Sequence, residues 1–427
     1  MISGEISQMW RDVAVDRMTL QSGLRVAWDP TPSVGTSALG LFIDVGSRDE
    51  WNAVWGASHF LEHAVFKGAG TRSGREIAEV GDRLGAEINA FTTRDYTCFY
   101  GKAMDPMLDA VYEVIESLVT EPWLAAADID RERQVIVEEM RESYDDASDR
   151  VAEALLWAVY DDPGFTHDIL GTQTSIEGLS QPSLRRFHQQ FYVPSRMVLA
   201  LAGEGGKAVM DRLIAGNGAV DSMVRTAPKV RPREVLLEED REQVQVLLGV
   251  VAPNWGSEES YPCDLLTTLL GGQTSSRLWQ RLREEEGIVY SVDADYQAEP
   301  DWALMTIGIG VHPSRLEQAV RLIGDEIHLA IANGFSADEI RRAKVQLRAG
   351  LWFGLETVDH RMLHLGRHLL RHRIPSTIPE MEAKIDAVEA EDLSQMMSQL
   401  WADSTQIAVA AVGPLGNIVN QGIKHLL

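Results

Sequence analysis

Apolar and polar positions alternate with the two-residue period of β-strands in several parts of the chain. The first two such segments run from Leu24 to Trp28 and from Ala38 to Val45. Gly46 to Asp49 reads as a turn, and a helical pattern follows it. Further strands are predicted over Glu87 to Tyr100 and Met197 to Ala202. The helical pattern after Asp49 therefore follows directly on a strand.

Apolar residues with helical spacing separate these strands. They predict helices over Ser73 to Leu84, Met107 to Val119, Asp128 to about Tyr160, and Leu184 to Phe191. Ser73 is a suitable N-cap and Gly85 a suitable stop for the first of them. The polar run Tyr144-Asp145-Asp146 should break or bend the long one. The first half of the chain thus mixes strands and helices.

The same order of elements recurs in the second half of the chain. The breakers between Glu204 and Glu234 predict a linker. After them we expect strands over Val244 to Val251, Tyr290 to Tyr296, Ala303 to Val311 and Ile407 to Val412, with helices at Cys263 to Leu270 and Ser276 to Glu285. The repeat predicts two similar domains, residues 1–215 and 235–427, joined by the linker 216–234.

Length, charge and cysteine content narrow the class of protein. At 427 residues the chain exceeds what one hydrophobic core usually supports. The 39 Lys and Arg against 64 Asp and Glu give a net charge of 39 − 64 = −25, which argues against nucleic acid or an anionic membrane as a partner. Cys98 and Cys263 stand far apart, and the N-terminal residues 1–18 lack an apolar signal-peptide core. We therefore expect a cytoplasmic protein.

The segment His59-Phe60-Leu61-Glu62-His63 carries the strongest chemical signal. Residues four apart lie side by side on a helix, so two imidazoles share one face with a carboxylate beside them. Two His can hold zinc, and Glu62 can take a proton from water at an open zinc position. This H-x-x-E-H order is the inverzincin signature. The alternative is an ordinary helix whose two His pair with neighbours.

A zinc site needs a further ligand, and the acidic helix after Asp128 offers several carboxylates. They are Glu132, Glu138, Glu139 and Glu142. Glu139 falls inside the stripe of Val135, Ile136 and Met140, whereas Glu138 falls on its edge. A carboxylate that faces the core needs a partner, and a cation is suitable. Glu132 lies about 10 Å earlier along the helix, which favours a supporting or substrate-facing role.

These motifs together resemble the pitrilysin-type metallopeptidases, in particular the branch of the mitochondrial processing peptidase and its bacterial relatives. HFLEHAVFKG is followed by ERQVIVEEM, and Glu139 comes 139 − 63 = 76 positions after His63. Leu84 to Thr92 matches the family's N-A-x-T strand, and Phe191 to Met197 matches F-Y-x-P-x-N-M, with Arg196 in place of Asn. Gly271 to Leu278 and Arg283 through Tyr290 are similar to the family's S-S-R-L and Arg/Tyr segments.

The resemblance implies a fold and a set of roles. Each domain should be α+β, a mostly antiparallel or mixed sheet packed with helices. His59, His63 and Glu139 should bind one zinc ion, with Glu62 as general base and Glu132 as supporting acid. Asn89 and Ala90 should pair with the substrate backbone.

The resemblance also implies roles for the second half, which lacks the zinc motif. Arg283 and Tyr290 should hold substrate and stabilise the oxyanion across a clamshell chamber, unless they merely pack on a sheet. The expected function is a zinc endopeptidase that cleaves peptides or unfolded segments. Because one chain carries both sets of residues, a homodimer with two shared sites is expected.

Other interpretations remain open from the sequence. The chain could be a non-catalytic subunit, as some chains of this branch are, or a metal-bound scaffold without turnover. His360, His364, His368 and His372 recur every four residues and could bind a second metal. With no acid interleaved from His360 to His372, and with arginines nearby, an amphipathic helix face is favoured.

Overall fold

The computed structural model describes residues 15–31, 35–372 and 376–427. Contacts divide the chain into two compact units. Unit 1 comprises Met1–Met140, His167–Val224 and Trp352–Ile378; unit 2 comprises Arg141–Thr166, Arg225–Leu351 and Pro379–Leu427. Most of the N-terminal segment on which the signal-peptide prediction rests lies outside the described residues. Within the described residues, no helix is both long and apolar enough to cross a membrane.

Unit 1 is built on a mixed sheet of order β1-β2-β8-β3-β7-β6. Its strands are β1 (Asp16–Thr19), β2 (Arg25–Asp29), β3 (Thr36–Ile43), β6 (Glu87–Thr92), β7 (Thr97–Met104) and β8 (Met197–Ala202), beside the small pair β4 (Gly68–Ala69) and β5 (Arg72–Ser73). Its helices are α2 (Ala57–Val65), α3 (Gly74–Leu84), α4 (Leu108–Thr120), most of α5 (Ala126–Asp145), α8 (Gln173–Gly178), α9 (Gln181–Phe191), α10 (Gly206–Arg212) and α14 (Val358–Leu370), with 3-10 turns η1 (Ser47–Asp49), η2 (Asn52–Val54), η3 (Asp105–Met107) and η4 (Pro194–Arg196).

Unit 2 is built on a sheet of order β11-β12-β10-β13-β9. Its strands are β9 (Glu234–Glu238), β10 (Val244–Val251), β11 (Val289–Ala298), β12 (Ala303–Val311) and β13 (Ala408–Gly413). Its helices are α6 (Ala147–Val159), α7 (Pro163–Thr166), α11 (Ser260–Leu270), the π-helical η5 (Trp279–Glu285), α12 (Leu316–Asn333), α13 (Ala337–Gly354), α15 (Ile378–Ala387), α16 (Ala390–Trp401) and α17 (Ile418–Gln421), with 3-10 turns η6 (Pro313–Arg315), η7 (Ser404–Gln406) and η8 (Lys424–Leu426).

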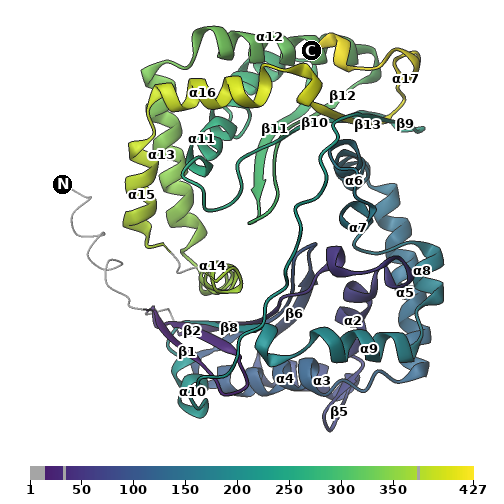
Figure 1. Cartoon of the computed structure of the whole chain (residues 1–427), viewed down its shortest axis with the longest axis vertical. Coiled ribbons are helices and arrows are strands. Elements are labelled where there is room, and N and C mark those ends of the chain that lie inside the picture. The colour runs from purple at the N-terminus through teal and green to yellow at the C-terminus, as the bar shows by residue number, and fades with distance from the viewer. Residues whose placement is uncertain (1–14, 32–34, 373–375) are drawn as a thin grey trace. The chain divides into compact units, whose positions relative to one another are not determined.

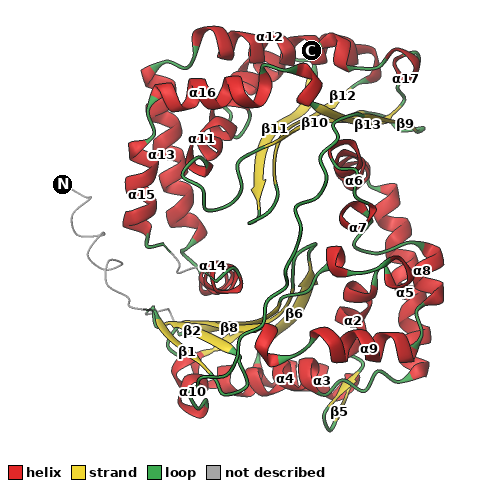
Figure 2. Cartoon of the chain, in the orientation of Figure 1, coloured by secondary structure: helices red, strands yellow, loops and turns green. Residues whose placement is uncertain are grey.

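The two sheets share one topology, which confirms the prediction of two similar α+β domains. Order β2-β8-β3-β7-β6 in unit 1 matches β9-β13-β10-β12-β11 in unit 2. In each sheet the first of these pairs is parallel and the others are antiparallel. Figure 2 shows both sheets in yellow.

Each sheet is covered on one face by a helix from the other half of the sequence. In unit 1, α14 packs on Phe42, Ala200 and neighbouring small residues of β2, β3 and β8. In unit 2, α6 packs on Ala408 and Ala410 of β13 and also contacts β10 (Figure 1). The sequence-based division assigns one continuous segment to each domain and so does not include the exchange of α6 and α14. The chain passes from unit 1 to unit 2 between Val224 and Arg225, which lie inside the predicted linker.

One local expectation changes in the structure, and another is confirmed. The segment Glu87 to Tyr100 is a hairpin rather than one strand, because Thr93 accepts hydrogen bonds from the Asp95 and Tyr96 amides and turns the chain. The long helix after Asp128 is broken as predicted. Helix α5 ends at Asp145, and Asp146 is the N-cap of α6. Asp146 Oδ1 accepts hydrogen bonds from the amides of Ser148 and Asp149.

Candidate metal centre

Helix α2 carries the H-x-x-E-H residues and is packed into the core of unit 1. Phe60, Leu61, Ala64 and Val65 are almost fully buried. The helix therefore has one fixed position, and the side chains of His59 and His63 project from it together, with ring centroids 4.6 Å apart. His59 is itself buried, at 7% exposure.

Helix α5 brings Glu139 against both imidazoles. Glu139 Oε1 lies 3.6 Å from His59 Nε2, and Oε2 lies 3.5 Å from His63 Nε2. One ligand atom from each of these residues lies within 4.8 Å of the others, and no other such group of potential metal ligands occurs among the described residues. Glu138 is exposed. Val135 is also exposed, at 49%, so the buried stripe is narrower than the sequence predicts, with Ile136 at its centre.

The three side chains fit a zinc ion chemically. Two imidazoles and one carboxylate are a ligand set of catalytic zinc sites, which keep a further position open. Glu139 Oε2 is buried and accepts no hydrogen bond from the described residues, so a cation would satisfy it.

Charges around the site agree with a cation-binding role. Burial lowers the pKa of His59, but the close contact with Glu139 and the charges of Glu62, Glu139 and Asp168 outweigh burial and raise the pKa overall. The contact with His59 lowers the pKa of Glu139, against the opposing effect of burial. The local field thus favours positive charge between these residues.

Glu132, for which a supporting role is predicted, lies next to His63, one of the three potential ligands. It is buried, at 5% exposure. Its Oε2 lies 3.4 Å from His63 Nδ1, and its Oε1 pairs with Lys67 Nζ at 2.8 Å. A carboxylate on the second ring nitrogen of a ligand His fixes the ring orientation. Sequence reasoning did not find Lys67, whose pairing depends on the packing of α5 against α2.

Glu62 and strand β6 lie on the same side of the site. Thr92 Oγ1, at the end of β6, donates a 2.5 Å hydrogen bond to Glu62 Oε2. In the described sheet β6 is an edge strand, paired through β7 alone. Asn89 is exposed on it, with its Oδ1 accepting from the Ala90 amide, and Ala90 is buried. An edge strand can pair with an extended peptide.

Arg283 and Tyr290 belong to unit 2 and contact each other there. Arg283 Nη1 donates to the carbonyl oxygen of Tyr290, and its guanidinium lies 4.8 Å from the Trp279 ring. Tyr290 sits at a bulge of β11, between Val289 and Ser291, and its side chain is 71% exposed. Bulges often direct a side chain at functional sites.

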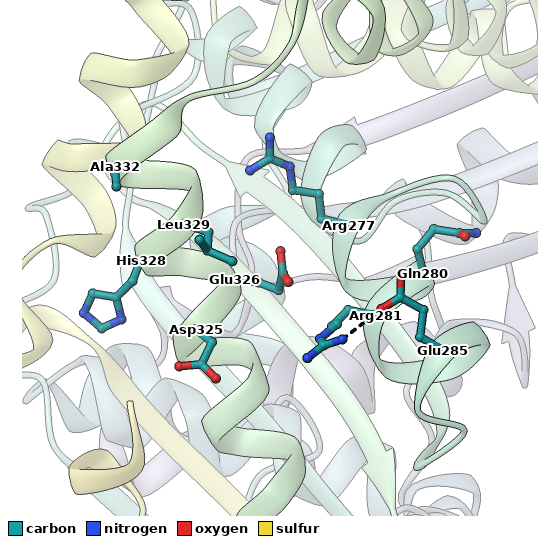
Figure 3. Close-up of a pocket in the computed structure, with 9 residues that line it drawn as sticks. All are labelled: Arg277, Gln280, Arg281, Glu285, Asp325, Glu326, His328, Leu329 and Ala332. Atoms are coloured by element: carbon teal, nitrogen blue, oxygen red, sulfur yellow. Dashed lines mark hydrogen bonds and ion pairs between the residues drawn. The ribbon is translucent and has the colours of Figure 1, made fainter.

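Two other features have local explanations. His360, His364 and His368 lie on the predicted amphipathic helix α14, and His372 follows its end. His364 Nε2 is buried, and burial lowers the pKa of His364 to about 3. Unit 2 has a surface pocket of about 820 Å³ between η5 and α12 (Figure 3). Its arginines already have acidic partners, Arg281 with Glu285 and Arg277 with Glu339.

Comparison with known proteins identifies the family. The family model described as "Insulinase (Peptidase family M16)" matches residues 25–173, and the model "Peptidase M16 inactive domain" matches residues 178–347. Proteins named "uncharacterized zinc protease" are similar over nearly the whole chain. One from Mycobacterium tuberculosis (strain ATCC 25618 / H37Rv) is 33% identical, covering 95% of this chain and 94% of its own length. YmxG of Bacillus subtilis (strain 168) is 30% identical, covering 95% and 99%.

Solved structures share the fold. A protease from Helicobacter pylori superimposes with a TM-score of 0.84 at 19% identity, covering 94% of this chain and 99% of that one. A peptidase M16 inactive domain from Pseudomonas fluorescens gives 0.83 at 17% identity, covering 94% and 98%. With two family models and full-length relatives at 30% identity or more, the chain belongs to the insulinase family of peptidases, M16.

Proposed function

We propose that this protein is a zinc-dependent endopeptidase that cleaves peptides or unfolded segments. The observation that carries the proposal is the convergence of His59, His63 and Glu139 within 4.8 Å, with Glu62 on the same helix turn. The relatives carry the name "uncharacterized zinc protease", which supports the proposal. Zinc held by these three side chains would polarise the scissile carbonyl and acidify a water molecule.

The residues of the chain supply the remaining steps. The Thr92 hydroxyl holds Glu62 Oε2, which leaves Oε1 to accept a proton from water and to return it to the leaving amine. Glu132 holds the ring of His63. The edge of β6, at Asn89 and Ala90, would pair with the peptide backbone and place the carbonyl near Glu62.

Replacing the base tests this mechanism. Glu62→Gln keeps the shape of the side chain and removes its basicity, so kcat on a quenched fluorescent peptide should fall by about 10²- to 10⁴-fold. Bound zinc, measured by metal analysis, should stay at the wild-type level. Wild-type turnover by the zinc-loaded variant would contradict the mechanism. A wild-type protein that binds zinc but cleaves no peptide would favour the scaffold interpretation instead.

We also propose that two copies form a homodimer in which Arg283 and Tyr290 of one copy serve the zinc site of its partner. Glu62→Gln and Tyr290→Phe should each be nearly inactive alone. Mixing them should restore about a quarter of wild-type activity, because random exchange gives half mixed dimers, each with one intact site. No recovery after verified subunit exchange, or a fully active monomer, would contradict the shared site.

A cytoplasmic location is part of the proposal. Cys98 and Cys263 are both free and buried, as expected for a protein from a reducing compartment. Cell fractionation that finds the protein outside the cytoplasm would overturn this point.

A further inference from the structure

The N-terminus of the metal helix is held by a side chain from the loop that precedes it. Helix α2 begins after Gly56, which has φ 88°, and its N-cap residue offers no side-chain acceptor. The Gly56 amide donates to Glu50 Oε2 at 2.6 Å, and the Ser58 amide donates to Glu50 Oε1 at 2.7 Å. The Glu50 side chain, just after η1, is fully buried, at 0% exposure. Both of its oxygens therefore serve the first turn of α2.

A second buried residue holds Glu50 in turn. His167 Nε2 lies 3.2 Å from Glu50 Oε2, and the His167 side chain is 3% exposed. Its ring stacks on Trp55, with centroids 4.7 Å apart and planes at 11°. His167 is also the residue at which the chain re-enters unit 1 after the segment Arg141–Thr166 of unit 2. The carboxylate is thus fixed from both sides.

The negative charge of this carboxylate acts on the positive N-terminal end of α2. A helix N-terminus carries roughly half a positive charge, which disfavours a cation placed nearby. His59 follows Ser58 directly, so a zinc ion on His59 would lie at this positive end. Burial raises the pKa of Glu50 overall, and the hydrogen bonds from His167 and Ser58 act against burial and favour the charged carboxylate. Burying a carboxylate costs free energy because it loses its water, and the contacts with Gly56, Ser58 and His167 offset part of that cost.

We propose that Glu50, held by His167, is a positioning residue for the metal centre. It fixes the turn of α2 that carries His59, and its negative charge offsets the positive helix end where zinc would bind. The inference rests on the zinc site of the proposed function, and it does not depend on peptide cleavage.

The test compares two Glu→Gln variants of the full chain, each of which replaces a carboxylate that accepts hydrogen bonds from two backbone amides. Glu50→Gln removes the charge at α2. Glu234→Gln removes a matched carboxylate in unit 2, where Glu234 Oε1 accepts from the amides of Ile423 and Lys424 at 2.6 and 2.7 Å. Zinc dissociation constants come from competition with a chromophoric chelator. The visible spectrum of the Co²⁺-substituted protein reports ligand geometry, and thermal unfolding of the metal-free proteins reports stability.

We expect Glu50→Gln to weaken zinc binding by about 10- to 100-fold, the usual cost of losing an outer-shell partner, and to change the Co²⁺ spectrum. Glu234→Gln should lower the unfolding temperature but leave zinc affinity and spectrum at wild-type values. Wild-type zinc affinity in Glu50→Gln, or an equal loss in Glu234→Gln, would overturn the proposal.

Two further outcomes remain decisive. If Glu50→Gln does not fold, His167→Gln keeps the carboxylate and should still weaken zinc binding, and wild-type affinity there would overturn the proposal. If the wild-type protein binds zinc but cleaves no peptide, the proposed function fails while the Glu50 inference can still be upheld by the affinities. Failure of the wild-type protein to bind zinc would overturn both.

Discussion

Helices α2 and α11 occupy corresponding places in two sheets of the same order, yet they carry different chemistry. Each follows the strand at the middle of its sheet, β3 or β10, and precedes the edge strand, β6 or β11. Helix α2 presents His59, Glu62 and His63. Helix α11 instead buries Cys263, Leu265 and Leu266, and Asp264 is its acidic residue. The comparison shows that the fold provides a site for chemistry, whereas particular side chains decide whether chemistry occurs there.

The two helix N-termini differ in the same way. The N-terminus of α2 rests on the buried carboxylate of Glu50. The N-cap of α11 is Glu259, which makes no side-chain capping hydrogen bond, and the Cys263 amide donates to the Glu259 carbonyl oxygen. Precise anchoring is therefore found on the helix that carries potential metal ligands.

The largest expected effect comes from removing Glu139, one of the three potential metal ligands. The described residues of unit 2 form no corresponding group of ligands. Glu139→Gln should weaken zinc binding by more than the roughly 100-fold upper cost of losing an outer-shell partner, because it removes a direct ligand. Its neighbour Glu138, which is exposed, provides the control: Glu138→Gln should bind zinc normally. Competition with a chelator measures both. The reverse result would show that α5 presents the other carboxylate to the metal.

The second effect concerns the exchanged helices. A Cβ at Gly366 of α14 would lie 2.0 Å from Phe42 Cε2, and Phe42 is fully buried and cannot move aside. Gly366→Ala should therefore lower the free energy of unfolding by about 1–3 kcal/mol, as overpacking does. Gly350 of α13 has no atom within 4 Å of such a Cβ, so Gly350→Ala should gain up to about 1 kcal/mol from helix propensity. Denaturant unfolding of both variants gives the comparison, and equal effects would contradict close packing of α14.

The smallest expected effect is a pH dependence in unit 2. Burial, with a contribution from Asp295, raises the pKa of Asp264 from 3.8 to about 7. The unfolded state then loses its proton first, so stability decreases as pH rises from about 4 to about 7. Asp264→Asn removes this loss and should stabilise the protein at pH 8 by on the order of 1–2 kcal/mol, with no gain near pH 4. Unfolding measured at both pH values would show it. A gain that does not depend on pH would mean that Asp264 is ionised throughout.

The position of the site in the chain follows from local patterns. The spacing of His59, Glu62 and His63 on one helix and the break at Asp146 each depend on a few neighbouring residues. The same holds for each strand in the repeated order. Helical and strand periodicities decide which side chains share a face, and they do so before any long-range contact forms. The sequence could thus predict the two related domains and the residues with metal-binding chemistry.

Tertiary structure decided the contacts that join distant segments. Glu50 and His167 stand 117 positions apart, and neither has a local pattern that marks it as the other's partner. The exchange of α6 and α14 between the sheets likewise depends on how two surfaces fit, such as the close contact of Gly366 on α14 with the large ring of Phe42 on β3. Periodicity shows that a face must be buried, but it does not name the segment that buries it. That choice depends on shape and charge complementarity between surfaces that come together only in the folded chain.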